Sequence, residues 1–197
     1  MYYLDEKTYN KISESIEIHS ISSFSKEKIS KFKFDSGIEE YNDFLFYEAL
    51  ELDNKNISKT FLMISKKTKI IVGYFSLATD NIKLTTEEII DVELDDIPFR
   101  SFPAIKLGKL AINKIIPDNI KIKGYGSFVL EIIDYYAYQV AEAGVGCRFI
   151  TVDADIEYEK GTDKFYLKNG FKYNENYKKN KGLTISMRRD VYGSLIK

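Results

Sequence analysis

The segment whose residues best suit chemistry is Lys121-Ile122-Lys123-Gly124-Tyr125-Gly126-Ser127. Glycines one residue apart let backbone N–H groups converge on an oxygen-rich ligand, and the first N–H groups of a following helix lie unpaired at the positive end of its dipole. Lys121 and Lys123 add cations beside them. The Gly-Lys-Ser/Thr ending of a P-loop is absent, and the dinucleotide fingerprint is incomplete because Val129 stands where its third glycine would. The segment therefore predicts a nucleotide-phosphate cradle, with a purely structural glycine turn at a helix start as the alternative.

The elements around this turn alternate in a way that indicates a mixed sheet. Apolar residues at three- and four-residue spacing predict helices over 38–52, from about 124 to the glycines at 144 and 146, and over 157–168. Alternating or β-rich runs predict strands at 15–24, 59–66, 69–79, 104–112 and 147–152, and a last hairpin from 171–173 and 183–189. The strand–helix–strand order after residue 104 predicts a parallel pair with a crossover helix. We expect an α/β (α+β) fold whose twisted, mixed central sheet of about six to seven strands is flanked by helices.

Composition limits the class of protein. A chain of 197 residues suits one domain over 1–197, with a core over about 15–190. The single cysteine excludes a disulfide framework, and the single histidine argues against a multi-histidine metal site. A net charge of −1 gives no global attraction to nucleic acid. The N-terminus has no signal-peptide pattern and no apolar run is long enough for a membrane span, so we expect a cytoplasmic protein.

Several polar residues have structural interpretations that outweigh chemical ones. The acidic stretch 80–98 predicts a surface excursion with a short helix near 86–90, ended by Pro98 and Pro103. The carboxylates at a predicted strand end favour capping of N–H groups over metal binding; they are Asp153, Asp155, Glu157 and Glu159. Cys147 lies in an apolar run and predicts a buried, inert thiol. We expect no metal site and no role for His19 in catalysis.

Two motifs resemble the GNAT superfamily of N-acetyltransferases. The strand Leu107–Ile112, followed by Lys121-x-x-Gly124-x-Gly126, is similar to the family's motif A, with Lys where the family has Gln or Arg. The segment Lys164-Phe165-Tyr166-Leu167-Lys168-Asn169-Gly170-Phe171 resembles its Phe-Tyr-x-x-x-Gly-Phe segment.

A narrower resemblance lies upstream, in Phe34-Asp35-Ser36-Gly37-Ile38-Glu39-Glu40-Tyr41. It is similar to the Phe-Asp-Cys-Gly start of GNAT toxins from bacterial toxin–antitoxin pairs, with Ser36 in place of Cys. Non-toxin relatives share this pattern. The resemblance covers roughly residues 34–174, and residues 1–14 are left without an interpretation.

The resemblance implies acetyl-CoA as the acetyl donor and no metal. It implies that the coenzyme diphosphate binds at Lys121, Lys123, Gly124, Tyr125, Gly126 and Ser127. It implies that the pantetheine pairs with Leu110, Ala111 and Ile112, on a strand that splays from 147–152, and that Phe165 lies beside the cofactor. By the same resemblance, the N–H of Leu110 stabilises the thioester oxyanion and Tyr166 protonates the leaving thiolate. Packing of Tyr166 beside Phe165 in the core is the alternative interpretation.

The acceptor amine is left open by the sequence. An α-amine with a pKa of about 8 is deprotonated more easily than lysine at about 10.4, which favours an α-amino acceptor such as an aminoacyl-tRNA. The resemblance implies that a toxin of this kind has a small ribbon-helix-helix antitoxin as its partner. Basic residues at 100–123 and 172–189 suit RNA phosphates, or coenzyme binding and an ordinary solvated face. The other hypotheses are an acetyltransferase for a small-molecule or protein amine without toxicity, and a non-catalytic CoA-binding regulator. A homodimer is left open, and no membrane partner is expected.

Overall fold

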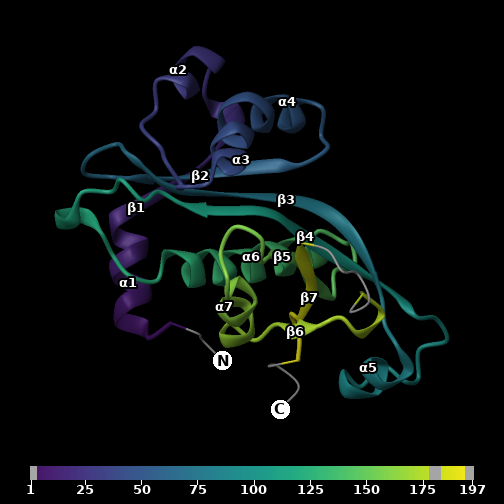
Figure 1. The fold of residues 1–197 in the computed structure, drawn as a ribbon. Helices are drawn as coiled ribbons and strands as arrows, with labels where there is room; N and C mark the ends of the chain where they lie inside the picture. Colours follow the sequence, from purple (N-terminus) through teal and green to yellow (C-terminus); the bar gives the residue numbers. More distant parts are fainter. Residues whose placement is uncertain (1–3, 178–182, 194–197) are drawn as a thin grey trace. The chain divides into compact units, whose positions relative to one another are not determined.

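The computed structural model describes residues 4–177 and 183–193 (Figure 1). Its strands form one seven-stranded sheet in the order β1-β2-β3-β4-β5-β7-β6. The strands are β1 (Ile16–Ser20), β2 (Lys59–Ser65), β3 (Ile71–Lys83), β4 (Ser101–Ile112), β5 (Phe149–Asp155), β6 (Lys172–Tyr173) and β7 (Thr184–Asp190). The expected mixed sheet is confirmed, because β4 and β5 pair in parallel while β1–β2, β2–β3, β5–β7 and β6–β7 pair antiparallel.

The helices follow the predicted alternation. They are α1 (Glu6–Ser15), α2 (Lys26–Ser30), α3 (Glu39–Asp43), α4 (Ala49–Asn54), α5 (Thr86–Asp91), α6 (Tyr125–Glu142) and α7 (Thr162–Lys168), with a π-helical segment η2 (Phe44–Glu48) between α3 and α4. Three short 3-10 turns are η1 (Ile21–Ser23), η3 (Asp118–Ile120) and η4 (Glu175–Tyr177). Helix α6 connects the parallel strands β4 and β5, as the crossover prediction requires. Among the residues that are described, none of the helices has the length and hydrophobicity needed to cross a bilayer.

The chain divides into two compact units, each built from separate stretches of sequence. The N-terminal unit comprises Tyr2–Ala78 and Gly108–Val129, and the C-terminal unit comprises Thr79–Leu107 and the chain from Leu130 onward. β3, β4 and α6 contribute residues to both. The prediction of one domain over 1–197 stays a prediction.

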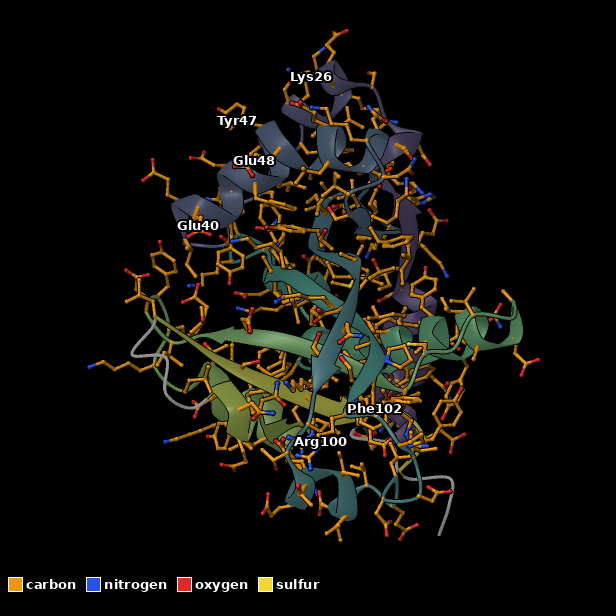
Figure 2. All side chains as sticks on the ribbon, turned by 90° about the vertical axis from the view of Figure 1, so that its right-hand side faces the viewer. Lys26, Glu40, Tyr47, Glu48, Arg100 and Phe102 are labelled. Carbon is orange, nitrogen blue, oxygen red and sulfur yellow. The ribbon has the colours of Figure 1, made fainter. Side chains whose placement is uncertain are left out.

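The N-terminal unit packs helices on β1, β2 and β3. Figure 1 shows α2, α3 and α4 on one side of these strands and α1 on the other. The buried core on the first side joins helical and strand residues; it includes Ile29, Leu45, Ala49, Leu62, Ile64, Ile71 and Tyr74. Apolar burial of this kind stabilises by roughly 25 cal/mol per Å². Opposite this core, Tyr47 and Glu48 project into solvent, and the exposed fraction of Tyr47 is 71% (Figure 2).

The C-terminal unit has its own core, and that core explains the acidic excursion. Residues before and within α5 pack with β4 and β5; the cluster comprises Ile82, Leu84, Ile89, Val92, Phe102, Ala104 and Phe149. Thr85 and Glu88 form a capping box that fixes the start of α5. The excursion predicted at 80–98 therefore contains the predicted short helix. Most of its apolar residues are buried or half-buried, with Ile90 exposed, while its carboxylates largely face solvent.

Several predicted boundaries are wrong, including the end of the strand predicted at 69–79, which runs on to Lys83. The strand predicted at 15–24 is confined to Ile16–Ser20, and α1 precedes it because Asp5 caps the N–H of Thr8. The helix predicted at 157–168 begins only at Thr162, because Gly161 adopts a left-handed conformation (φ +97°). Pro103 does not end the acidic excursion but lies inside β4.

Candidate functional site

The glycine turn lies in the N-terminal unit, immediately before α6. Gly124 has φ +112°, a conformation that L side chains rarely adopt. A Cβ added there would meet Leu4 Cδ2 at 3.0 Å and Thr8 Cγ2 at 3.5 Å. Both backbone conformation and close packing therefore require glycine at position 124.

Helix α1 packs against this turn, so the N-terminal residues that the sequence left without an interpretation have a structural role. Thr8 and Ile12 lie within contact distance of the Gly124 position. Tyr9 packs on Phe128 of α6, with ring centroids 5.1 Å apart. The sequence offered one signal for this helix, the Asp5-x-x-Thr8 spacing, in which Asp5 accepts hydrogen bonds from both the N–H and the hydroxyl of Thr8.

The first turn of α6 has backbone N–H groups that can donate to a ligand. The N–H of Phe128 donates to the carbonyl of Gly124 at 2.9 Å. Within residues 4–177 and 183–193, no acceptor is found for the N–H groups of Tyr125, Gly126 and Ser127. Unpaired N–H groups at the positive end of an 18-residue helix form a site that favours an anion.

Of the side chains around the turn, that of Tyr125 is anchored to the protein, and those of Lys121 and Lys123 are exposed to solvent. The Tyr125 hydroxyl donates to the carbonyl of Ile120 at 3.1 Å, and burial raises the pKa of this phenol. Tyr125 is therefore mainly a packing residue, and its contact with the coenzyme stays a prediction. Lys121 and Lys123 are exposed, and neither forms an ion pair within the described part of the chain. They are positioned in sequence to add positive charge beside the free N–H groups.

The strand residues Leu110, Ala111 and Ile112 end β4 in the N-terminal unit. Ala111 is buried, and Leu110 and Ile112 are half-buried. A Cβ at Gly73 would lie 2.8 Å from the carbonyl of Ala111, so glycine there lets β3 approach this stretch closely. β5 residues Phe149–Val152 pair with Ala104–Leu107, upstream of the three predicted residues, and the splay at Leu110–Ile112 stays a prediction.

The Phe-Asp-Ser-Gly motif builds the loop that leads into α3. The Asp35 carboxylate accepts hydrogen bonds from the Asn42 side chain at 3.0 Å and from the N–H of Gly37 at 2.7 Å, and these bonds lower the pKa of Asp35. Ser36 is buried, and its hydroxyl donates to Asn42 Oδ1. No sequence pattern indicated Asn113, which is buried directly after β4. Its side-chain oxygen accepts from the N–H of Asp35, and its side-chain nitrogen donates to the carbonyl of Ile71. The motif thus links the start of α3 to the end of β4 inside one unit.

Tyr166 and Phe165 lie on α7 in the C-terminal unit. Tyr166 is 6% exposed and sits between Phe165 and Phe171, with ring centroids 5.1 and 5.2 Å away. The N–H of Phe171 donates to the Tyr166 carbonyl at 3.0 Å, and Gly170 at φ +78° completes the helix end. The core packing expected as the alternative is present, and the catalytic role of Tyr166 stays a prediction.

Arg189 fixes the end of α7 and is not a surface cation. Its guanidinium is 4% exposed and donates to the carbonyl of Asn169 at 3.0 Å and to Asp134 at 2.6 Å. Arg188 is equally buried and pairs with Glu88 at 2.6 Å. The interpretation that both arginines contribute to an RNA-binding patch is therefore wrong. Lys178, Lys179 and Lys181 of the same patch lie outside the described residues.

The remaining candidates agree with the structural interpretations, with one change. Cys147 is buried, and burial raises its thiol pKa. His19 is partly exposed beside Glu17. Asp155 accepts from the N–H of Glu157 in a turn, so it caps no helix, and Asp153 pairs with Lys106. No cluster suited to a metal ion occurs in the described parts of the chain.

Several solved structures have a fold similar to that of this chain. KacT, solved as a tyrosine-to-phenylalanine mutant, is 20% identical, with a TM-score of 0.65 over 87% of this chain and 94% of that one. AtaT complexed with acetyl-methionyl-tRNAfMet is 16% identical, with a TM-score of 0.69 over 92% of this chain and 98% of that one. AtaTR bound with AcCoA is 18% identical, with a TM-score of 0.66 over 93% and 98%.

The GNAT-like fold expected from the sequence is confirmed by these similarities. No family model matches the chain. Identities this low establish a common fold and leave the reaction open.

Proposed function

We propose that this protein is an N-acetyltransferase that uses acetyl-CoA to acetylate a primary amine. The observation that carries the proposal is the start of α6, where three N–H groups without an acceptor in the described structure follow a glycine that no other residue could replace without strain. Binding of AcCoA by the similarly folded AtaTR supports this assignment.

The residues at the turn fit a coenzyme A diphosphate. Orphaned N–H groups of Tyr125, Gly126 and Ser127 supply neutral donors, and Lys121 and Lys123 supply charge. No carboxylate lies in the first turn of α6 to repel a phosphate. When bound, the coenzyme supplies an activated thioester, and the protein provides only binding and proton transfer.

The roles of the remaining predicted residues belong to the same proposal. We assign the backbone of Leu110, Ala111 and Ile112 to the pantetheine amides, the N–H of Leu110 to the thioester oxygen, and Phe165 to a contact with the coenzyme. Tyr166 donates the proton that the leaving thiolate requires, a role that suits a phenol because phenols ordinarily stay protonated up to a pKa of about 10. Tyrosine-to-phenylalanine mutants of KacT and AtaT have been solved, which makes the same exchange at Tyr166 the natural test.

We propose the α-amine of an aminoacyl-tRNA as the acceptor, and a toxin with an antitoxin partner as the biological role. Two solved structures of AtaT support these two parts. One is complexed with acetyl-methionyl-tRNAfMet, and the other, a mutant toxin, is bound to the C-terminus of the antitoxin AtaR. An α-amine also needs less help from a base than a lysine side chain does.

A second candidate acceptor, a small-molecule or protein amine, is favoured by one observation. Burial of Arg188 and Arg189 in ion pairs removes two cations from the surface that an RNA would need. The two acceptors differ in how binding depends on salt, because tRNA recognition weakens steeply as salt rises.

One experiment separates these possibilities. The purified protein is incubated with acetyl-CoA and a pool of aminoacylated tRNA, and the nucleoside ends are analysed by mass spectrometry for acetyl-aminoacyl adenosine. A parallel reaction contains free amines. Acetylated tRNA ends, together with growth arrest on expression without an antitoxin, support the proposal. Acetylation of free amines alone selects the second candidate, and coenzyme binding with no transfer to any amine leaves a regulator.

A further inference from the structure

The C-terminal unit contains a polar pocket that the sequence did not reveal. Its volume is about 290 Å³, and its walls come from the end of β3, from β4, β5 and β7, and from the segment before η4. The polar residues of these walls include Asp80, Lys106, Thr151, Asp153, Asn174 and Ser186. A volume at the lower limit of the roughly 300–1,000 Å³ typical of ligand sites suits a small polar group.

The sheet register explains why these side chains face one another. Thr151 pairs with Lys106 on β4, and Asp153 pairs with Ser186 on β7. Thr151 and Asp153 are two residues apart on β5 and so project from the same face, while Val152 between them is buried on the other. The same face therefore presents two hydroxyls, a carboxylate and an ammonium to the pocket.

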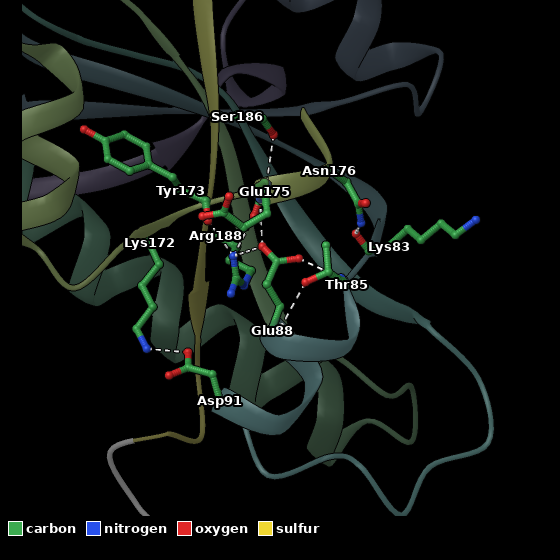
Figure 3. A network of polar contacts seen from close by, with 11 residues as sticks. Lys83, Thr85, Glu88, Asp91, Lys172, Tyr173, Glu175, Asn176, Ser186 and Arg188 are labelled. Carbon is green, nitrogen blue, oxygen red and sulfur yellow. Dashed lines mark hydrogen bonds and ion pairs between the residues drawn. The ribbon is translucent and has the colours of Figure 1, made fainter. Parts of the chain in front are cut away.

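The walls are held in place by a hydrogen bond between two of their own residues and by contacts with residues outside the pocket. Asn174 donates from its side chain to Ser186 Oγ at 2.9 Å, and its own Oδ1 accepts from Arg188 at 3.2 Å. Arg188 in turn pairs with buried Glu88 (Figure 3). Asn176 donates to the carbonyl of Lys83 at 2.8 Å and so ties the segment beside Asn174 to the end of β3 (Figure 3).

The charge of the pocket selects a cation. Lys106 neutralises Asp153 at 2.5 Å. Asp80 accepts a hydrogen bond from the Thr151 hydroxyl and one from the N–H of Asn81, and within the described residues it has no cationic partner. The lining therefore carries one uncompensated negative charge, surrounded by groups that can both donate and accept hydrogen bonds.

We propose that this pocket binds the amino group of the acetyl acceptor, with Asp80 as the partner of the ammonium and the Thr151, Asn174 and Ser186 side chains as partners of the adjoining polar atoms. The inference rests on the proposed function, because it identifies the acceptor as a small α-amine with polar neighbours. Asp80 holds the amine in its protonated form, and the amine releases this proton to water before its nitrogen attacks the thioester.

The test uses the full chain and glycinamide, whose α-ammonium and amide resemble the end of an aminoacyl ester. Binding is measured by titration calorimetry at pH 6.5, where this amine is protonated, and N-acetylglycinamide is the neutral control. Asp80→Asn is expected to weaken glycinamide binding at least tenfold. Lys106→Met leaves Asp153 without its cation and is expected to tighten binding threefold or more. Asp91→Asn, which alters an exposed ion pair outside the pocket, is expected to change nothing.

A kinetic arm separates this inference from the proposed function. If the protein is an acetyltransferase, Asp80→Asn raises the KM for the amine at least tenfold and leaves the KM for acetyl-CoA within twofold. If no transfer is found at all, the binding arm still decides whether the pocket holds an amine. Equal binding of glycinamide and N-acetylglycinamide, or a Lys106→Met variant that binds more weakly, overturns the proposal. Binding of a neutral polyol in place of the amine overturns it as well.

Discussion

Replacing Arg188 with methionine should strongly destabilise the protein. The guanidinium and the Glu88 carboxylate are each 4% exposed, and one guanidinium nitrogen donates to Glu88, to the Tyr173 carbonyl and to Asn174. The substitution leaves a buried carboxylate without its cation and deprives two acceptors of a donor. Breaking a buried pair from one side costs roughly 3–5 kcal/mol.

The local contacts place the expected loss near the middle of that range. Glu88 keeps two backbone donors, the N–H of Thr85 at 2.8 Å and that of Glu175 at 2.8 Å, which lessens the penalty on its charge. The acceptors orphaned at Tyr173 and Asn174 increase it. We expect a loss of about 4 kcal/mol, and a fall of the melting temperature by roughly 8–16 °C for a chain of this size.

Urea unfolding followed by circular dichroism measures this loss. The matched control is Lys172→Met, which removes an exposed ion pair with Asp91 close to the same network (Figure 3) and should cost less than about 1 kcal/mol. Combining Arg188→Met with Glu88→Leu should recover part of the loss, because no buried charge remains. A loss for Arg188→Met no larger than that of the control would refute the assignment of this pair as a buried clamp.

Three further outcomes are expected. Gly124→Ala should cost about 1–3 kcal/mol of stability, since it forces a strained φ and a 3.0 Å approach to Leu4, and it should weaken acetyl-CoA binding; unchanged affinity in a calorimetric titration would contradict the role of the turn. Tyr166→Phe should lower kcat roughly 10²–10⁴-fold in an acetyl-transfer assay while coenzyme affinity stays the same, because only the proton donor is lost; a fully active variant would exclude the acid role. Because burial raises the pKa of Cys147, little thiolate forms at pH 8, and a thiol reagent should label it there only after unfolding; rapid labelling of the native protein would show that the thiol is accessible.

The sequence alone determined the order and type of most elements. Apolar spacing is a local property, so the crossover helix α6, the hairpin β2–β3 and the short α5 could be predicted from it. The glycine turn could be predicted for the same reason: a glycine ahead of a helix indicates a special backbone conformation, and Gly124 has one. The predicted start of α7 was wrong because Gly161 separates the preceding turn from the helix, while the composition of the chain changes little at this point.

Only the tertiary structure decided which charged side chains are buried and which partners they have. Arg188 and Glu88 are 100 residues apart, and Arg189 and Asp134 are 55 apart, so no local pattern could show that these cations are buried and paired. Asp80 and Thr151, 71 residues apart, meet in the pocket for the same reason. A charge has the same identity in the sequence whether it is solvated or buried, and only long-range pairing across the sheet determines which of the two it becomes.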